Sequence, residues 1–173
     1  MPKTKDAVIN YAIYEDANEI YGTAQVQLPD LNSLTTTLSG AGIAGNVEVV
    51  IRGHMDAMSM TINFNTFCKE QAALAEQRPH NLDIRVAQQG TDSTSGELGV
   101  DAIKHIARVT PKSLKYGKIA PAATADASGE YAVSYLATYI NGEKINEIDP
   151  LNFICIINGT DYLAEVRKAL GKN

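Results

Sequence analysis

The most suggestive chemical motif in the sequence runs from Gly40 to Gly45 and matches the G-x-G-x-x-G loop of dinucleotide-binding proteins. That loop opens a helix whose N-terminus contacts the pyrophosphate, and an acidic residue about twenty positions further on binds the ribose. Here Val47, Val49 and Ile51 follow with the alternation of a strand, and no acidic residue lies at that distance. We therefore expect a flexible loop or hairpin tip instead of a nucleotide site.

The residue types that bind metals or act as nucleophiles are present, but their spacing does not favour either chemistry. His54, His80 and His105 are far from one another and from any cysteine, so the sequence predicts no metal site. No G-x-S-x-G elbow or activated cysteine places a nucleophile. Cys68 and Cys155 lie in apolar or helix-like surroundings, which is typical of buried thiols in a reducing compartment. We predict a protein that is not an enzyme and has no cofactor.

Composition limits the remaining choices. The 173 residues, 45% of them hydrophobic, predict a single domain over 1–173. Fifteen basic against twenty acidic residues give a net charge of −5, which argues against a surface that grips nucleic acid. No apolar run approaches the roughly twenty residues of a membrane span, and no export signal is recognisable, so we expect no membrane anchor.

The strongest predicted strand covers residues 57–66. One side of it carries large apolar residues and is expected in the core: Met58, Met60, Ile62 and Phe64. The other side is small and uncharged: Ser59, Thr61, Asn63 and Asn65. We expect this strand to form a hairpin with the preceding strand, which carries Val47, Val49 and Ile51 on one side, through the connection 52–56.

Further strands are predicted wherever apolar residues alternate. An N-terminal hairpin joins residues 9–13 to 24–28 through the turn 15–19, and two more strands cover 82–86 and 102–109. Residues 88–97 and 111–129 are rich in Gly, Pro, Ser, Thr or Ala and are expected to form loops. In the C-terminal third, Asn141 and Gly142 predict a tight type I′ turn between strands 131–140 and 143–148.

Two helices complete the prediction. Residues 66–77 are strong helix formers, with Thr66 as a possible N-cap. After an apolar strand over 151–157 and a turn at Asn158, Thr160 or Asp161 is expected to cap a final helix that ends before Gly171. The fold class is therefore mainly β: an antiparallel β-sandwich or barrel-like fold with one short internal helix and a C-terminal helix.

Several local strings, together covering most of the chain, resemble the major tail tube proteins of contractile-tailed (myovirus-type) phages. The matching strings are Val26–Leu31, Ser39–Gly45, Val47–Phe67, Tyr139–Glu143, Glu147–Asn152 and Asn158–Arg167. The resemblance implies the tail-tube fold and hexameric rings that stack into a hollow tube inside a contractile sheath. It also implies sheath, tape-measure, baseplate and tail-terminator proteins as partners, a place in the virion tail, and assembly in the cytoplasm of a bacterial host.

The resemblance gives roles to surface residues. If each subunit gives four strands, as in related tubes, six subunits form a barrel of about 24 strands with a lumen roughly 38 Å wide. A DNA duplex is about 20 Å wide, so it fits through this lumen and is expected to pass without specific binding. We expect the uncharged row Ser59, Thr61, Asn63 and Asn65 to face this lumen. Residues 1–7 and 111–129 are expected to be mobile until rings stack, with inter-ring contacts from Lys3, Lys5, Lys115 and Tyr116.

Three alternatives remain open at this point. The first is a tube subunit of a type VI secretion apparatus or another contractile injection system, which would share the fold and the ring. The second is a small β-sandwich binding module that uses Tyr131, Tyr135 and Tyr139 on one strand face. The third is a hydrolase, for which the sequence supplies no placed nucleophile.

Overall fold

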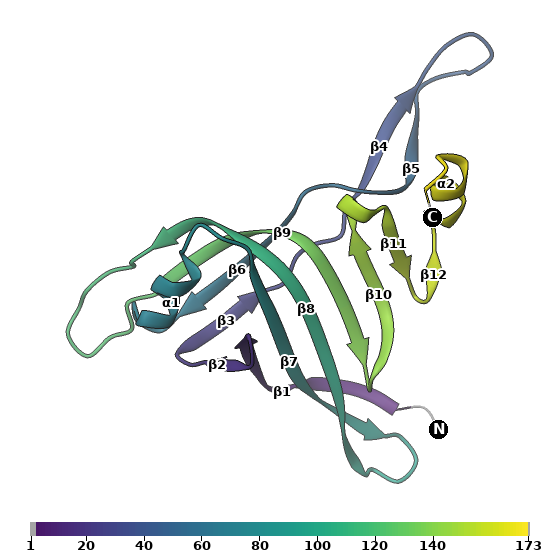
Figure 1. Ribbon diagram of the computed structural model, residues 1–173. Helices are drawn as coiled ribbons and strands as arrows, with labels where there is room; N and C mark the ends of the chain where they lie inside the picture. Colours follow the sequence, from purple (N-terminus) through teal and green to yellow (C-terminus); the bar gives the residue numbers. More distant parts are fainter. Residues whose placement is uncertain (1–2, 173) are drawn as a thin grey trace.

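The computed structural model describes residues 3–172 and is mainly antiparallel β with two short α-helices, as predicted (Figure 1). The strands of its first half are β1 Lys3–Glu15, β2 Asn18–Ile20, β3 Thr23–Gln27, β4 Ser33–Leu38, β5 Val47–Met55 and β6 Met58–Phe64. Those of its second half are β7 His80–Asp92, β8 Leu98–Lys115, β9 Ala127–Ile140, β10 Glu143–Asp149, β11 Ile154–Ile157 and β12 Thr160–Asp161. The helices are α1 Lys69–Leu74, the 3-10 turn η1 Pro150–Asn152 and α2 Ala164–Ala169.

Ten strands form one large sheet in the order β12-β11-β10-β9-β8-β7-β1-β2, with β6 and β3 branching from β9. The branch arises because the first half of β9 pairs with β6 and its second half pairs with β10. The main path ends at β12 and β2 and the branch ends at β3, so β2 and β3 lie at different edges of the sheet although they are consecutive in the chain. The long strands β7, β8 and β9 bend accordingly, and the sheet curls around the core (Figure 1).

The core lies inside this curl and contains the predicted core row of β6. Met58, Met60, Ile62 and Phe64 are at most 5% exposed. They pack with buried residues of the neighbouring strands and of α1: Ile13, Leu74, Leu82, Ile84, Val109 and Tyr131. The buried Gln71 of α1 donates from Nε2 to the carbonyl oxygens of Lys115 (3.2 Å) and Ser128 (3.0 Å). Helix α1 thereby joins the end of β8 to the start of β9.

The predicted pairing of the strand at 47–51 with the strand at 57–66 is wrong. Strand β5 pairs with β4, and the two form a separate two-stranded sheet that projects from the body (Figure 1). Both edges of β6 are occupied, one by β3 and the other by β9, so no edge is left for β5. The glycine run 40–45 forms the tip of the β4–β5 hairpin, in agreement with the expected hairpin tip.

The N-terminal segment also differs from expectation. Strand β1 turns at Asp16 and Ala17 and pairs with β2, but the following strand β3 leaves the hairpin and pairs with β6. Residues 3–7, expected to be mobile, belong to β1 and pair with β7, while residues 1 and 2 lie outside the described part of the chain. The ladder to β7 is formed by residues about eighty positions away, which local composition does not reveal.

The predicted loops are shorter in the structure. Strand β7 continues to Asp92, so the loop predicted for 88–97 is largely strand. Strand β8 runs through Pro111 to Lys115, which reduces the predicted 111–129 loop to residues 116–126. Pro111 sits beside a register shift between Pro111 and Ser113, and a bulge is one of the few strand positions that tolerates a residue without an N–H.

The helix boundaries need correction as well. Cys68, not Thr66, is the N-cap of α1. Leu163 is the N-cap of α2, whereas Thr160 and Asp161 form β12. Residues 150–152 form a 3-10 turn with Leu151 75% exposed, so the strand predicted over 151–157 is confined to β11. Gly171 follows the C-cap Leu170 with a φ of +67°, as predicted for the C′ position.

Candidate functional site

The side of the sheet opposite the core carries the predicted lumen row. Ser59, Thr61 and Asn63 alternate with the core row along β6 and therefore point away from the core. Across the ladder to β9 they oppose Ala132, Glu130 and Ser128. Asn65 lies beyond the end of β6. Its N–H donates to the carbonyl of Gly22 (2.9 Å) and its carbonyl accepts from Ala125 (2.7 Å). The structure thus brings three of the four predicted residues together on one strand face.

The adjoining strands extend this surface with charged and aromatic side chains. Strand β8 contributes Arg108 and Lys112, and β9 contributes Glu130 and Tyr135. We call the surface the polar face and define it by Ser59, Thr61, Asn63, Arg108, Lys112, Glu130 and Tyr135. Lys104, Arg108 and Lys112 are spaced by four residues along β8, and an even spacing favours one face of a strand.

The basic groups of the polar face are held by acidic or aromatic partners. Lys112 Nζ lies 3.0 Å from Glu130 Oε1 and 3.3 Å from Ser59 Oγ, so a cation borders the uncharged row. The guanidinium carbon of Arg108 lies 5.7 Å from the centre of the Tyr135 ring. The Tyr135 hydroxyl donates to Glu147 Oε1 (2.8 Å), and burial together with this bond raises the pKa of Tyr135. The surface is polar: Lys112 is paired with Glu130, and Arg108 contacts an aromatic ring.

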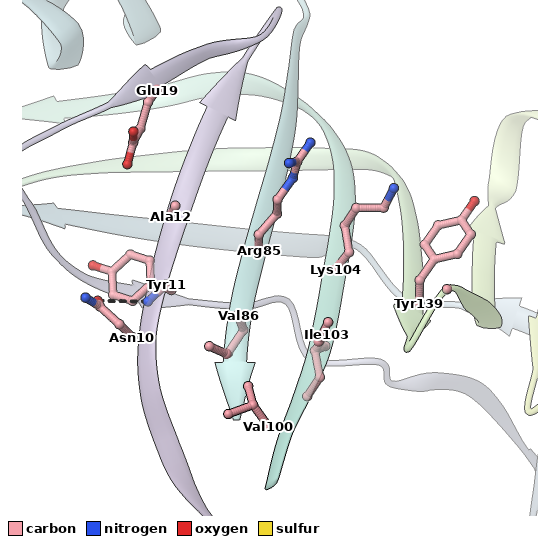
Figure 2. A pocket seen from close by; sticks show the side chains of 13 residues that line it. Asn10, Tyr11, Ala12, Glu19, Arg85, Val86, Val100, Ile103, Lys104 and Tyr139 are labelled. Atoms are coloured by element: carbon pink, nitrogen blue, oxygen red, sulfur yellow. Dashed lines mark hydrogen bonds between the residues drawn. The ribbon is translucent and has the colours of Figure 1, made fainter. Parts of the chain in front are cut away.

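A shallow concavity of about 860 Å³ lies further along the same side of the sheet (Figure 2). A cross-strand row of Ala12, Arg85, Lys104 and Tyr139 spans it from β1 to β9. Lys104 Nζ lies 5.0 Å from the centre of the Tyr139 ring, and Arg85 lies 4.8 Å from that of Tyr14. The remaining lining combines the aliphatic residues Val86, Ala87, Val100, Ala102 and Ile103 with Asn10, Tyr11, Glu19 and Gly142. Such a surface suits an apolar protein segment with a polar rim.

The predicted turn residues Asn141 and Gly142 connect β9 to β10, with φ values of +50° and +85°. A type I′ turn requires positive φ at both positions. The side chain of Asn141 has a further role that the sequence did not indicate. Its Oδ1 accepts from the N–H of Ala102 (3.0 Å) and its Nδ2 donates to Asp101 (3.0 Å). The turn is therefore tied to the start of β8.

The four predicted inter-ring residues fall into two separate groups. Lys3 and Lys5 lie on β1 opposite the end of β7, and Lys5 forms an ion pair with Asp101. Lys115 and Tyr116 lie at the opposite end of the 18-residue strand β8. The exposed ring of Tyr116 packs on Phe67 with centroids 4.8 Å apart.

Tyr131, Tyr135 and Tyr139 do not share a face, so the aromatic row that a binding module would use is absent from β9. Tyr131 is 1% exposed and belongs to the core. The ladder to β8 shifts register between Arg108 and Val109, which places Tyr135 and Tyr139 on the other side of the sheet.

The histidines and cysteines do not converge. His80 is buried, with Nδ1 against the carboxylate of Glu15 and Nε2 3.0 Å from the carbonyl oxygen of Glu76. His105 Nδ1 lies 2.9 Å from Thr138 Oγ1, and burial lowers the pKa of His105. Within residues 3–172, no three His, Cys, Asp or Glu side chains are grouped to hold a metal ion. Cys68 is half-buried and Cys155 buried, and neither forms a disulfide.

Across the described part of the chain, no helix has the length and apolar character needed to span a membrane.

Comparisons with known proteins agree with the arrangement of the strands. A chain from the cryo-EM structure of the PVC sheath/tube terminator in the extended state, part of an extracellular contractile injection system, is similar in fold. Its TM-score is 0.53 at 11% identity over 76% of this chain and 94% of that one. A chain from the PVC sheath-tube complex in the extended state gives a TM-score of 0.51 at 13% identity, over 75% and 87%.

Sequence comparison is more specific than the likeness in fold. No curated protein gives a significant match to the chain. Residues 5–171, however, match the family described as phage tail tube protein FII. This match includes every strand from β2 to β12 and both α-helices. Because it covers nearly the whole chain, the chain belongs to the phage tail tube protein FII family.

Proposed function

We propose that residues 1–173 form one tail-tube domain that assembles into hexameric rings, and that these rings stack into a tube whose lumen conducts DNA. The observation that carries the proposal is the family match over residues 5–171. The subunit acts structurally, and neither a cofactor nor a metal takes part.

The open edge of β1 supports association between subunits. One edge of β1 is paired with β7 from Lys3 to Glu15. The other edge is paired with β2 only at Ile13–Glu15, so within the described chain it is free from Lys3 to Ala12. An unpaired edge of this length is a template for another strand, and a closed ring of subunits removes it.

The polar face supports a role as the channel wall. Ser59, Thr61 and Asn63 supply uncharged groups that bind water, and the adjoining Lys112 is paired with Glu130 at 3.0 Å. Phosphates bind where unpaired Lys and Arg side chains release counterions. The Lys112 cation is paired with Glu130 and the Arg108 guanidinium lies over the Tyr135 ring, so both are partly occupied within the chain and DNA can slide with little adhesion.

The two groups of proposed inter-ring residues suit opposite surfaces of a ring. Lys3 and Lys5 lie near the start of β8, and Lys115 and Tyr116 lie at its end. Stacked rings bring the lower surface of one ring against the upper surface of the next, so each group would meet the other across the junction. The expected further partners are the sheath, tape-measure, baseplate and tail-terminator proteins of a virion tail assembled in the bacterial cytoplasm.

A second candidate is the tube of a contractile injection system that carries protein cargo, including one of the type VI secretion class. The likeness in fold to two PVC chains favours it. The two functions differ in what passes through the tube. A neighbouring gene for a phage tape-measure or tail-completion protein, and DNA inside isolated particles, would favour the phage tail.

Electron microscopy of the purified protein tests the proposal directly. We expect rings or tubes with a central channel wide enough for a duplex. Dispersed monomers at all concentrations would contradict it.

A further inference from the structure

The β4–β5 hairpin has an apolar side that no other part of the described chain covers. The opposed pairs Thr36 with Val49 and Leu38 with Val47 lie on one side, and the alternation along the strands adds Leu34 and Ile51. Leu34, Leu38, Val47 and Ile51 are 37–49% exposed. We call this surface the apolar hairpin side and define it by Leu34, Thr36, Leu38, Val47, Val49 and Ile51.

The other side of the hairpin is more polar. Thr35, Thr37 and Glu48 lie there, and Thr35 Oγ1 donates to Glu48 Oε1 at 2.7 Å. Val50 is opposed to Thr35 on this side and is 60% exposed. A sheet with one apolar and one polar side normally buries the apolar side against another layer. No described part of this chain supplies that layer.

The base of the hairpin packs closely against Leu163, which sets its direction, and the exposed Arg52–Glu165 pair adds little to this contact. Gly53 packs so closely on Leu163 that a Cβ added there would lie 2.4 Å from Leu163 Cδ2. Arg52 forms an ion pair of 2.8 Å with Glu165 of α2. Beyond this base the hairpin stands clear of the body (Figure 1). A two-stranded hairpin is only marginally stable in water by itself, which indicates that another chain completes it.

The same chain offers a second uncovered apolar surface. Leu98, Val100 and Ala102 alternate along one side of β8, and Leu98 and Val100 are 68% and 66% exposed. Ala87 is opposed to Ala102, and both line the concavity together with Val100 (Figure 2). We call this surface the apolar strip and define it by Ala12, Ala87, Leu98, Val100 and Ala102. The strip and the tip of the hairpin lie at opposite ends of the molecule, so the hairpin does not reach its own strip (Figure 1).

We propose that the apolar hairpin side of one copy packs into the apolar strip of a second copy. The inference rests on the proposed function as a self-assembling tube subunit, and it identifies one of the contacts. The apolar hairpin side supplies six residues and therefore forms one part of an interface, for which about 20–30 residues a side is standard. Arg85 and Tyr139 at the rim of the strip are residue types enriched at the energetic centres of interfaces. Because the two surfaces differ, the contact is heterologous and builds rings or helical stacks.

Two matched substitutions on β5 test the contact. Val47→Asp places a carboxylate on the apolar hairpin side, and Val50→Asp places the same group on the polar side of the same strand. We expect Val47→Asp to raise the concentration needed for assembly by about tenfold or more, because a buried unpaired charge opposes the contact. Val50→Asp should assemble like the parent. Light scattering measures assembly, and melting curves verify that both variants are folded.

Cross-linking between differently tagged copies tests the partner surface. One copy carries Val47→Cys and the other Val100→Cys, and a short bismaleimide reagent is added to the mixed assembly. We expect a linked pair with one tag of each kind, whereas Val50→Cys with Val100→Cys should give little. The parent serves as the blank, because it contains the buried Cys155 and the half-buried Cys68.

The outcomes separate this inference from the proposed function. If the parent assembles, and Val47→Asp assembles as well as Val50→Asp, the hairpin side does not contact a second copy and the inference is overturned while the tube function stands. Lost assembly without the Val47–Val100 cross-link would overturn the apolar strip as the partner surface. A parent that stays monomeric at every concentration would contradict both.

Discussion

At the scale of single residues, the polar face depends on how its charges are paired. Asn63 is half-buried on β6 and is opposed to Ser128 on β9, with the Lys112–Glu130 pair nearby. A lysine introduced at this position would add a positive charge, and the nearby carboxylate of Glu130 is already paired with Lys112. The residue is therefore well placed to test whether the absence of free positive charge matters for passage.

We predict that Asn63→Lys slows DNA ejection and that the effect is larger at low salt. Each subunit of a ring would add an ammonium group to the wall, and phosphate contacts of this kind weaken as salt screens them. Tubes should still form, because the core row of β6 is unchanged. Ejection rates measured over a range of salt concentrations test this, with Asn63→Gln as the neutral control. Equal ejection rates for the two variants at low salt would show that Asn63 does not face the lumen.

Labelling of Asn63→Cys reports the location of the residue independently of ejection. A bulky thiol reagent should modify the dispersed subunit quickly and intact long tubes slowly, since it enters the lumen mainly through the ends. Rapid and uniform labelling of intact tubes would place the polar face on the outside. The parent corrects for reaction at Cys68 and Cys155.

A second residue-scale prediction concerns the ion pair between β12 and α2. Arg167 Nη2 lies 2.5 Å from Asp161 Oδ2, and Arg167 Nη1 donates to the carbonyl of Phe153 at 2.7 Å. The Arg167 guanidinium lowers the pKa of Asp161 below its ordinary value of 3.8, helped by the N–H of Leu163. A lowered native pKa means that the pair stabilises the fold above the unfolded pKa and that this stability is lost as pH falls through the native pKa.

We therefore expect Asp161→Asn to lower the melting temperature at pH 7 and to have a much smaller effect near pH 2. Glu165→Gln is the matched control, because its side chain is 78% exposed where it pairs with Arg52 and should contribute little. Thermal unfolding across this pH range provides the measurement. A loss for Asp161→Asn that is the same at both pH values would show that charge is not its cause.

At the scale of elements, the turn between β9 and β10 controls register at the junction with β8. Gly142 has a φ of +85°, and a Cβ there would meet nothing within 4 Å, so backbone conformation alone disfavours a side chain. Asn141 ties the same turn to Ala102 and Asp101 of β8.

Gly142→Val should destabilise the protein by more than about 1 kcal/mol, because a β-branched residue is strained at positive φ. Gly142→Asn is the control, since asparagine tolerates that region far better. Urea unfolding of the two variants and the parent tests the prediction. If the valine variant unfolds at the same urea concentration as the parent, the turn tolerates a conformation without positive φ.

At the scale of the whole molecule, we expect the loop 116–126 to be accessible in the free subunit and covered in the assembled tube. Lys118 is 76% exposed at its side chain and the neighbouring Ile119 is fully exposed. We predict that trypsin cuts after Lys118 in the monomer and spares this site in tubes, because stacked rings cover the loop. Mass spectrometry of the fragments identifies the cut. Equal cleavage in monomers and tubes would show that this loop does not lie between stacked rings.

The sequence determined most of the local structure by itself. The alternation in β6, the paired turn residues Asn141 and Gly142, the hairpin tip at 40–45 and the C′ glycine Gly171 follow from side-chain direction and from backbone conformations that few residues adopt. Each of these features depends on neighbours only a few positions away. The mainly β fold with two short helices followed from the same local patterns.

Only the tertiary structure decided which strands pair and which surfaces remain uncovered. The alternating apolar residues Val47, Val49 and Ile51 predict that one side of the strand is buried. They do not distinguish burial within the same chain from burial against a second copy. Because β3 and β9 occupy both edges of β6, β5 pairs with β4 and its apolar side stays exposed. The charge pairs of the polar face likewise depend on ladders between distant strands. Long-range pairing follows from competition among all edges of the sheet, and no local pattern records the result of that competition.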